Sequence, residues 1–254
     1  MSQIVSVEIG NITTHAKSLL KNTITFESRI MEAQDQHLLD SSREIFEIDN
    51  KKFMLEMGSY ENNIYKYEKK NFKNILHYAV SKVAESGNVK LITSIPANQY
   101  NAFKDEMKNV IMNNNKITVI SDEKIKNITI EEVAILPEGY SVYKTTPKEF
   151  LIVGAKTIII DIGGGTTELI IFDENGRFIY GDSVNEGLLN LFDKIQTDIQ
   201  SKSKKLISIE DVRKFVDREL KVIGLNNYTY DSIVNEFGGK LINLINGKIP
   251  YLMQ

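Results

Sequence analysis

The residues best suited to chemistry lie around a glycine turn in the second half of the chain. Asp161 stands near the end of an apolar run, Gly163–Gly165 follow, and Thr166 and Thr167 come next. Glycines let main-chain N–H groups approach an anion closely, and a carboxylate beside a phosphate can hold a hydrated Mg²⁺ ion. The Gly-Lys-Ser/Thr signature of a P-loop does not follow. The pattern predicts a phosphate site of another kind, with a plain β-hairpin as the alternative.

A second glycine turn stands near the N-terminus. Ile4–Ile9 alternates apolar and other residues and is followed by Gly10 and Asn11, which predicts a strand that ends in a tight turn. Gly163 lies 153 residues after Gly10, and each turn ends an early strand of its own half. This spacing suggests two related lobes.

The elements that position these turns alternate along the chain. The first block, up to a hairpin over residues 44–55, predicts a β-meander. Apolar residues at helical spacing predict helices over residues 71–83 and 98–112, on either side of a strand over 89–95. Strands are expected again over 157–162, 169–172 and 177–180. Together these elements predict an α/β fold.

Composition excludes several classes of protein. With 42% apolar residues, 26% charged residues and four prolines among 254, the chain can bury a core. The lack of cysteine removes disulfides, thiolate nucleophiles and Cys-ligated zinc, and it fits a reducing cytoplasm. A formal charge of −3 argues against a general nucleic-acid binder. Since no run approaches the roughly 20 apolar residues of a membrane helix and no secretion signal is recognisable, we expect a cytoplasmic protein without membrane contact.

Both glycine turns resemble known phosphate motifs. DIGGGTTEL (161–169) is similar to the second phosphate motif of the actin, Hsp70 and sugar-kinase superfamily, and VSVEIGNITTHAK (5–17) resembles the first. Within that superfamily, TFESRI (25–30), LITSIP (91–96) and EVAILPEG (132–139) resemble, in this order, segments of the plasmid-segregating actin-like proteins of the ParM and StbA group. This resemblance, which covers most of residues 1–190, implies a two-lobed, ribonuclease-H-like ATPase fold. The lobes would be residues 1–153 and 154–254, the second with a reduced outer subdomain.

The resemblance also implies roles for individual residues. Asp161 would act in catalysis by holding Mg²⁺ and the attacking water, and Glu8 would be the other carboxylate at the metal. Glu138 would orient the water for in-line attack, or else it is a turn residue after Pro137. The phosphates of ATP, or of GTP, would be held by Gly10, Asn11, Thr13, Gly163, Gly164, Gly165, Thr166 and Thr167.

Two positions of the first motif depart from the family's pattern. Glu8 stands where the family usually has Asp, and His15 stands where it usually has Lys. A longer carboxylate displaces a metal contact, and a histidine is only partly charged at pH 7. Both departures would slow or retune hydrolysis.

Two alignments remain open at the C-terminus. In the first, residues 230–242 are the family's adenosine motif, and Gly238 and Gly239 lie under the nucleotide. In the second, residues 230–245 are the helix before that motif, and Lys248–Met253 begins a strand.

Two clusters of charged residues are interpreted as solvated surface. The first cluster combines Tyr60, Tyr65 and Tyr67 with Lys66, Lys69 and Lys70. It could form a nucleic-acid-binding surface, but we predict that it is the solvated start of a helix. The basic run Ser201–Lys205 favours a solvated loop.

The resemblance implies a bacterial, filament-forming ATPase that segregates plasmid DNA. Its partners would be further copies of itself and a DNA-binding adaptor on the plasmid centromere, without direct sequence-specific DNA contact. Two alternatives stay open. DIGGGTTEL also resembles the motif of exopolyphosphatases, in which Glu168 would belong to the catalytic region, and a catalytically silent actin-like scaffold would keep the fold without turnover.

Overall fold

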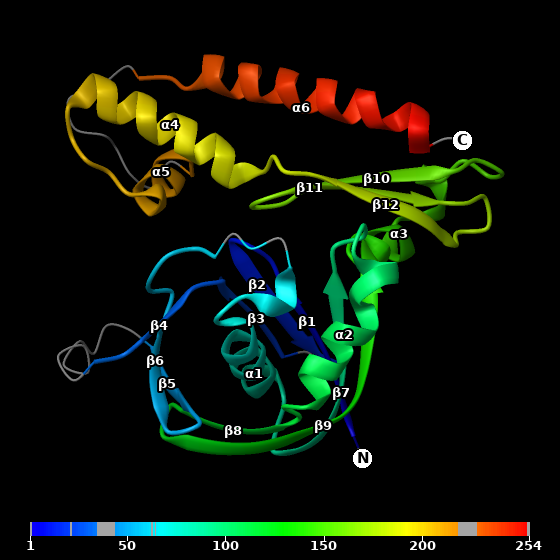
Figure 1. The fold of residues 1–254 in the computed structure, drawn as a ribbon. Coiled ribbons are helices and arrows are strands. Elements are labelled where there is room, and N and C mark those ends of the chain that lie inside the picture. Colours follow the sequence, from blue (N-terminus) through cyan, green and yellow to red (C-terminus); the bar gives the residue numbers. More distant parts are fainter. Residues whose placement is uncertain are drawn as a thin grey trace. The chain divides into compact units, whose positions relative to one another are not determined.

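The chain forms two compact units, residues 1–150 and residues 151–254. The computed structural model (Figure 1) describes residues 2–20, 22–34, 44–61, 63, 65–217 and 228–252. In each unit, helices pack against one β-sheet. Within these described residues, no helix combines the length and the apolar character needed to cross a bilayer.

The first unit is built on a nine-stranded sheet in the order β3-β2-β1-β7-β9-β8-β5-β6-β4. The predicted strand over residues 4–9 and the predicted hairpin over 44–55 are both confirmed, as β1 and as β5 with β6. The strands are β1 (Gln3–Ile9), β2 (Thr13–Ser18), β3 (Thr23–Glu27), β4 (Ile30–Glu32), β5 (Ile45–Ile48), β6 (Lys51–Leu55), β7 (Gly87–Ile95), β8 (Lys116–Ser121) and β9 (Lys124–Pro137).

Helix α1 (Phe72–Val83) lies on the inner side of this curved sheet, where it contacts β1, β2, β3 and β8 (Figure 1). Its predicted apolar face is buried, and residues such as Leu76 and Val80 are at most 1% exposed. On β1, Val7 and Ile9 face this core, while Glu8 faces outward, as the alternation of a strand requires. Helix α2 (Tyr100–Met112) packs against β9. Both predicted helices are therefore confirmed.

Three adjacent strands of this sheet run parallel. β1 pairs with β7 and β7 with β9, with Val7 opposite Thr93 and Ile95 opposite Pro137. Adjacent parallel strands end at the same edge of a sheet, which is where α/β proteins gather their ligand-binding loops. The turn at Gly10 and the residue Glu138 therefore follow strands that end at one edge. Short helices flank this region: η2 (Lys66–Glu68), α3 (Tyr140–Thr145) and η3 (Lys148–Phe150).

The second unit holds an antiparallel sheet in the order β10-β11-β12. The strands are β10 (Thr157–Ile162), β11 (Thr167–Phe172) and β12 (Phe178–Val184), in agreement with the three predicted runs. Central strand β11 is buried along its whole length. Helices α4 (Leu188–Ser203), α5 (Ile209–Val216) and α6 (Asp231–Leu252) complete the unit.

Helix α6 corrects the predictions for the C-terminal region. Buried Phe237, Leu241 and Ile245 recur every four residues on a helix that contacts α4 and β12. The strand expected over Lys248–Met253 is wrong, because the helix continues through Leu252; Met253 lies outside the described residues. The helix predicted over residues 230–245 by the second alignment is present.

Candidate functional site

Glu138 is held at the carboxyl edge of the parallel strands. It follows β9 directly, and its main-chain N–H donates to the carbonyl oxygen of Ile95 at 2.9 Å. The next residue, Gly139, has a φ of 77°, a left-handed conformation that glycine adopts without strain. The turn therefore fixes the main chain on both sides of the carboxylate.

Lys66 holds the Glu138 side chain from η2. Its ammonium group pairs with Glu138 Oε1 and also donates to the carbonyl oxygen of Ser94 at 3.1 Å. The two side chains are only 5% and 15% exposed. The solvated helix start predicted for this segment is therefore wrong at Lys66 and at the neighbouring buried Tyr67. Sequence reasoning missed Lys66 as a member of the site.

Lys69 reaches the glycine turn of the same unit. Its ammonium group donates to Asn11 Oδ1, the side-chain amide oxygen of the residue that follows Gly10. The turn itself is closed by a hydrogen bond from Gly10 N–H to the Thr13 carbonyl oxygen at 2.9 Å. The structure thus brings together Asn11, Lys66, Lys69 and Glu138, of which the sequence pointed only to the first and the last.

The pKa of Lys69 is lowered from 10.5 to about 8. Burial is the largest cause, and the positive charge of Lys66 adds to it; the carboxylates of Glu138 and Glu61 act in the opposite direction. Among the described residues, no carboxylate lies within ion-pair distance of Lys69. The fold keeps a cation here at a cost in stability.

Replacing Lys69 by methionine is expected to raise the free energy of unfolding at pH 7 by about 1–2 kcal/mol, because it removes this cost. A depressed lysine pKa destabilises the fold fully below pH 8, and the effect fades as the pH rises toward 10.5. Urea unfolding should therefore show that the stability gained by Lys69→Met shrinks as the pH rises from 8 toward 10.5. The exposed Lys70, changed to methionine, is the matched control, and a Lys69→Met protein less stable than this control at pH 7 would contradict the expectation.

Glu8 and His15 lie on the outward face of the first hairpin. They are directly opposite each other across β1 and β2, and both are exposed. His15 Nδ1 shares a hydrogen bond with Thr25 Oγ1 at 2.9 Å. The cation in contact with Asn11 therefore comes from Lys69 and not from the position where the family usually has lysine.

The glycine turn of the second unit is fixed by the start of α4. The N–H groups of Leu188 and Leu189 donate to the carbonyl oxygens of Gly163 and Gly164, at 3.0 and 2.8 Å. The first N–H groups of a helix have no partner within the helix, and here the glycine carbonyls supply one. Gly163 N–H closes the turn onto the Thr166 carbonyl oxygen at 2.9 Å.

This arrangement decides where the free N–H groups of the turn point. In a trans peptide the carbonyl and the following N–H point in opposite directions, and the described residues contain no cis peptide. Because the carbonyls of Gly163 and Gly164 point to α4, the N–H groups of Gly164 and Gly165 point away from it. Neither N–H donates to a main-chain carbonyl of the described residues. Their peptide dipoles align with that of α4, which adds positive potential at the turn.

The polar residues around this turn have different positions. Asp161 is half-buried at the end of β10 and directly opposite Glu168, which in turn is opposite Ser183. Glu168 is 3% exposed and accepts a hydrogen bond from Ser183 Oγ at 2.8 Å. The Thr167 hydroxyl is buried and donates to the Glu186 carbonyl oxygen at 2.7 Å, so it supports the turn from inside.

Replacing Gly187 by alanine is expected to lower the free energy of unfolding by about 1–3 kcal/mol, because the added methyl group has no room. Its Cβ would lie 2.6 Å from the Gly164 carbonyl oxygen and 2.7 Å from that of Gly163. Gly239 lies inside α6, and a Cβ added there would meet no atom within 4 Å. Gly239→Ala should therefore raise the free energy of unfolding by about 0.5–1 kcal/mol. Thermal unfolding of the two variants measures the effect of the same substitution at the turn and inside a helix. Equal changes in Tm would refute this account of the turn.

Gly238 and Gly239 do not form a glycine turn. Both lie within α6, where main-chain N–H groups serve the hydrogen bonds of the helix. The role under the nucleotide that the first alignment gives to these two residues stays a prediction.

The described residues contain no cluster of three or more histidine, aspartate or glutamate side chains placed to hold an ion. Mg²⁺ is commonly held by one or two carboxylates together with phosphate oxygens and water. Asp161 could supply such a carboxylate, and the N–H groups of the adjacent turn could hold the phosphate. Glu8 lies in the other unit.

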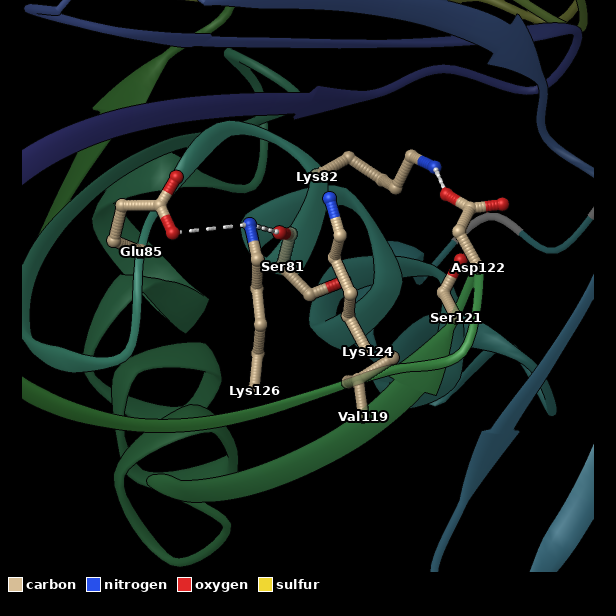
Figure 2. A pocket seen from close by; sticks show the side chains of 8 residues that line it. All are labelled: Ser81, Lys82, Glu85, Val119, Ser121, Asp122, Lys124 and Lys126. Atoms are coloured by element: carbon tan, nitrogen blue, oxygen red, sulfur yellow. Dashed lines mark hydrogen bonds and ion pairs between the residues drawn. The ribbon is translucent and has the colours of Figure 1, made fainter.

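A cavity of about 210 Å³ lies at the far end of α1 from Lys69 (Figure 2). Lys82 pairs with Glu44 and with Asp122, both at 2.8 Å. Lys126 donates to the carbonyl oxygens of Ser81 and Ala84 at 2.9 and 2.7 Å, and so satisfies the C-terminal end of α1. None of the residues that line the cavity belongs to the predicted site, so the two are separate.

Solved structures with this fold include several filament proteins. One is the subunit of a 15-stranded ParM filament from Clostridium botulinum; the match covers 97% of this chain and 84% of that subunit, with a TM-score of 0.77 and 14% sequence identity. The ADP complex of Ta0583, an archaeal actin homologue, matches 96% and 81%, with a TM-score of 0.77 and 14% identity. The AlfA filament from the B. subtilis plasmid pLS32 matches 85% and 88%, with a TM-score of 0.57 and 14% identity. The predicted actin-like α/β fold is thereby confirmed.

A family model also matches the sequence itself. Residues 7–140 match the N-terminal domain of actin-like proteins. No functionally curated protein matches the sequence significantly.

Proposed function

Because this chain belongs to the family of actin-like proteins, we propose that it is a nucleotide-dependent filament protein that segregates plasmid DNA. The observation that carries the proposal is the family match over residues 7–140, which includes the first glycine turn and Glu138. The likeness of nearly the whole chain to a ParM filament subunit supports it.

The proposed ligand is ATP, or GTP, bound with Mg²⁺. The ADP complex of the archaeal actin homologue supports an adenine nucleotide. In the second unit, Gly164, Gly165 and Thr166 would bind phosphate oxygens, with Gly163 and Thr167 holding the turn. In the first unit, the same role would belong to the turn of Gly10, Asn11 and Thr13. The ion would be held by Asp161, with Glu8 as the further carboxylate, and when bound it would neutralise charge on the phosphates.

Glu138 is proposed to orient the water that attacks the terminal phosphate. Its main-chain anchor on Ile95 and its pairing with Lys66 support this role, because a positioning residue needs a fixed carboxylate. Asp161 would act on the same water from the second unit. Positioning and electrostatic stabilisation supply most of the catalysis in phosphoryl transfer.

The two compact units are proposed to be the two actin-like lobes, with the nucleotide contacting the glycine turn of each. Subunits that join head to tail form open filaments when the contact does not close a ring. A nucleotide that binds the assembling conformation more tightly shifts the population toward it, and hydrolysis reverses that preference. Further partners would be a DNA-binding adaptor, consistent with the net charge of −3, and the place of action would be the cytoplasm.

Phosphate release from Mg-ATP, measured over a range of protein concentrations, tests this function. A filament-forming ATPase should show turnover per subunit that rises steeply above a critical concentration. An exopolyphosphatase-like enzyme should release phosphate from polyphosphate at a rate per subunit independent of concentration. Nucleotide binding without phosphate release would instead select the silent scaffold. The burial of Glu168 gives the phosphohydrolase alternative no support.

A further inference from the structure

Two lysines of one short segment differ in what they contact. Lys66 has a carboxylate partner in Glu138 and a carbonyl partner in Ser94. Lys69, three residues later, contacts the neutral amide oxygen of Asn11. A partly buried ammonium group normally requires a carboxylate partner, since a neutral oxygen only partly compensates its lost hydration. The contact of Lys69 is therefore the weaker of the two and the easier to exchange.

The place of this contact points to an anion. Asn11 belongs to the glycine turn after β1, and within the described part of the chain the N–H groups of Asn11 and Ile12 donate to no main-chain carbonyl. His15, which lies on the strand after the turn, is exposed and shares a hydrogen bond with Thr25. Lys69 is thus the lysine in contact with this turn.

We propose that Lys69 binds a phosphate oxygen of the nucleotide at the first turn and exchanges its hydrogen bond to Asn11 for that oxygen. The inference rests on the proposed function and adds a binding residue that the motif itself does not contain. In the resulting contact a charged donor meets a charged acceptor, which is stronger than a hydrogen bond to an amide. Lys66 stays with Glu138 and acts as a positioning residue.

The surroundings of Lys69 support this exchange. The charged groups that act on it are Lys66, Glu138 and Glu61, and together with burial they leave its pKa at about 8. A phosphate in contact with Lys69 would raise that pKa, so binding would take up a proton above pH 8. The affinity for nucleotide should therefore fall as the pH rises from 7 to 9.

The test is the dissociation constant of Mg-ATP for the wild-type protein and three variants, measured by calorimetry. At pH 7, Lys69→Met should raise the constant about tenfold or more, as expected when a charge-assisted contact is lost. Lys69→Arg should remain within about threefold of wild type, and Lys70→Met should be unchanged. Between pH 7 and 9 the wild-type constant should rise about tenfold, whereas that of Lys69→Arg should stay nearly flat.

Two results would overturn the inference while leaving the proposed function intact. One is a Lys69→Met protein that binds Mg-ATP as tightly as wild type, and the other is an identical pH dependence in wild type and Lys69→Arg. Wild-type protein that binds no nucleotide would overturn both. Since Lys69→Met is expected to be no less stable than wild type, thermal unfolding of the same samples separates lost affinity from lost structure.

Discussion

Replacing Asp161 by asparagine is expected to lower phosphate release from Mg-ATP by about 10²–10³-fold with little change in stability. Asparagine has the same size but carries no charge, so it cannot support the metal or accept a proton from the attacking water. Asp161 is half-buried near the end of β10, two residues before Gly163. Single-turnover phosphate release, with nucleotide affinity measured separately, tells a loss of chemistry from a loss of binding.

The matched control is Asp173→Asn in the same unit. Asp173 Oδ1 accepts hydrogen bonds from the N–H groups of Asn175 and Arg177, at 2.9 and 2.8 Å, in the turn between β11 and β12. This aspartate organises a turn other than that of Gly163–Gly165, so the Asp173→Asn variant should retain its phosphate release. An Asp161→Asn protein with wild-type turnover would exclude Asp161 from the chemistry.

Replacing Lys66 by methionine is expected to lower the free energy of unfolding by about 2–4 kcal/mol, because it leaves the Glu138 carboxylate largely buried without its partner. It should also lower phosphate release, since Glu138 loses the contact that fixes it. Adding Glu138→Gln to Lys66→Met should recover much of the stability but none of the turnover. Urea unfolding of the two single variants and the double variant measures the coupling.

The control for this cycle is the pair of Lys90 and Glu132, which joins neighbouring strands of the same sheet at 2.9 Å. Both of its side chains are at least half exposed, and exposed pairs contribute little to stability. Lys90→Met should leave the unfolding midpoint unchanged. Effects of Lys66→Met and Glu138→Gln that simply add in the double variant would contradict a coupled, buried pair.

The local elements were predictable from the sequence because each has a strong period. The apolar face of α1 and the alternation of β1 follow directly from their residues, as do both glycine turns. Residues 116–131, for which we made no prediction, form most of the β8–β9 hairpin. The alternation of Ile117 and Val119 with polar residues was a usable signal for β8.

The site was predictable only in part, because its assembly depends on contacts between distant segments. Lys66 and Glu138 are 72 residues apart, and nothing in the charge run around Lys66 distinguishes it from a solvated surface. Long lysine side chains can bury their stems while the ammonium group finds a polar partner, and sequence patterns do not show which lysine does so. The parallel register of β1, β7 and β9 places the Gly10 turn and Glu138 at one edge, but it does not show that Lys66 joins them.

The C-terminal alternatives show how a helix period can outweigh a glycine pair. Each of the two glycines at 238 and 239 disfavours a helix by about 1 kcal/mol. The apolar residues Phe237, Leu241 and Ile245 keep one face buried through this region, and burial of three such side chains exceeds that cost. The spacing was present in the sequence and favoured the helix.

The central claim, nucleotide-dependent assembly, is tested most directly by sedimentation and negative-stain imaging of the purified chain with Mg-ATP, with Mg-ADP and without nucleotide. The account predicts filaments in the pellet with Mg-ATP, fewer with Mg-ADP, and none for an Asp161→Ala variant that remains folded. Wild-type protein that stays in the supernatant as single subunits under all three conditions would contradict it.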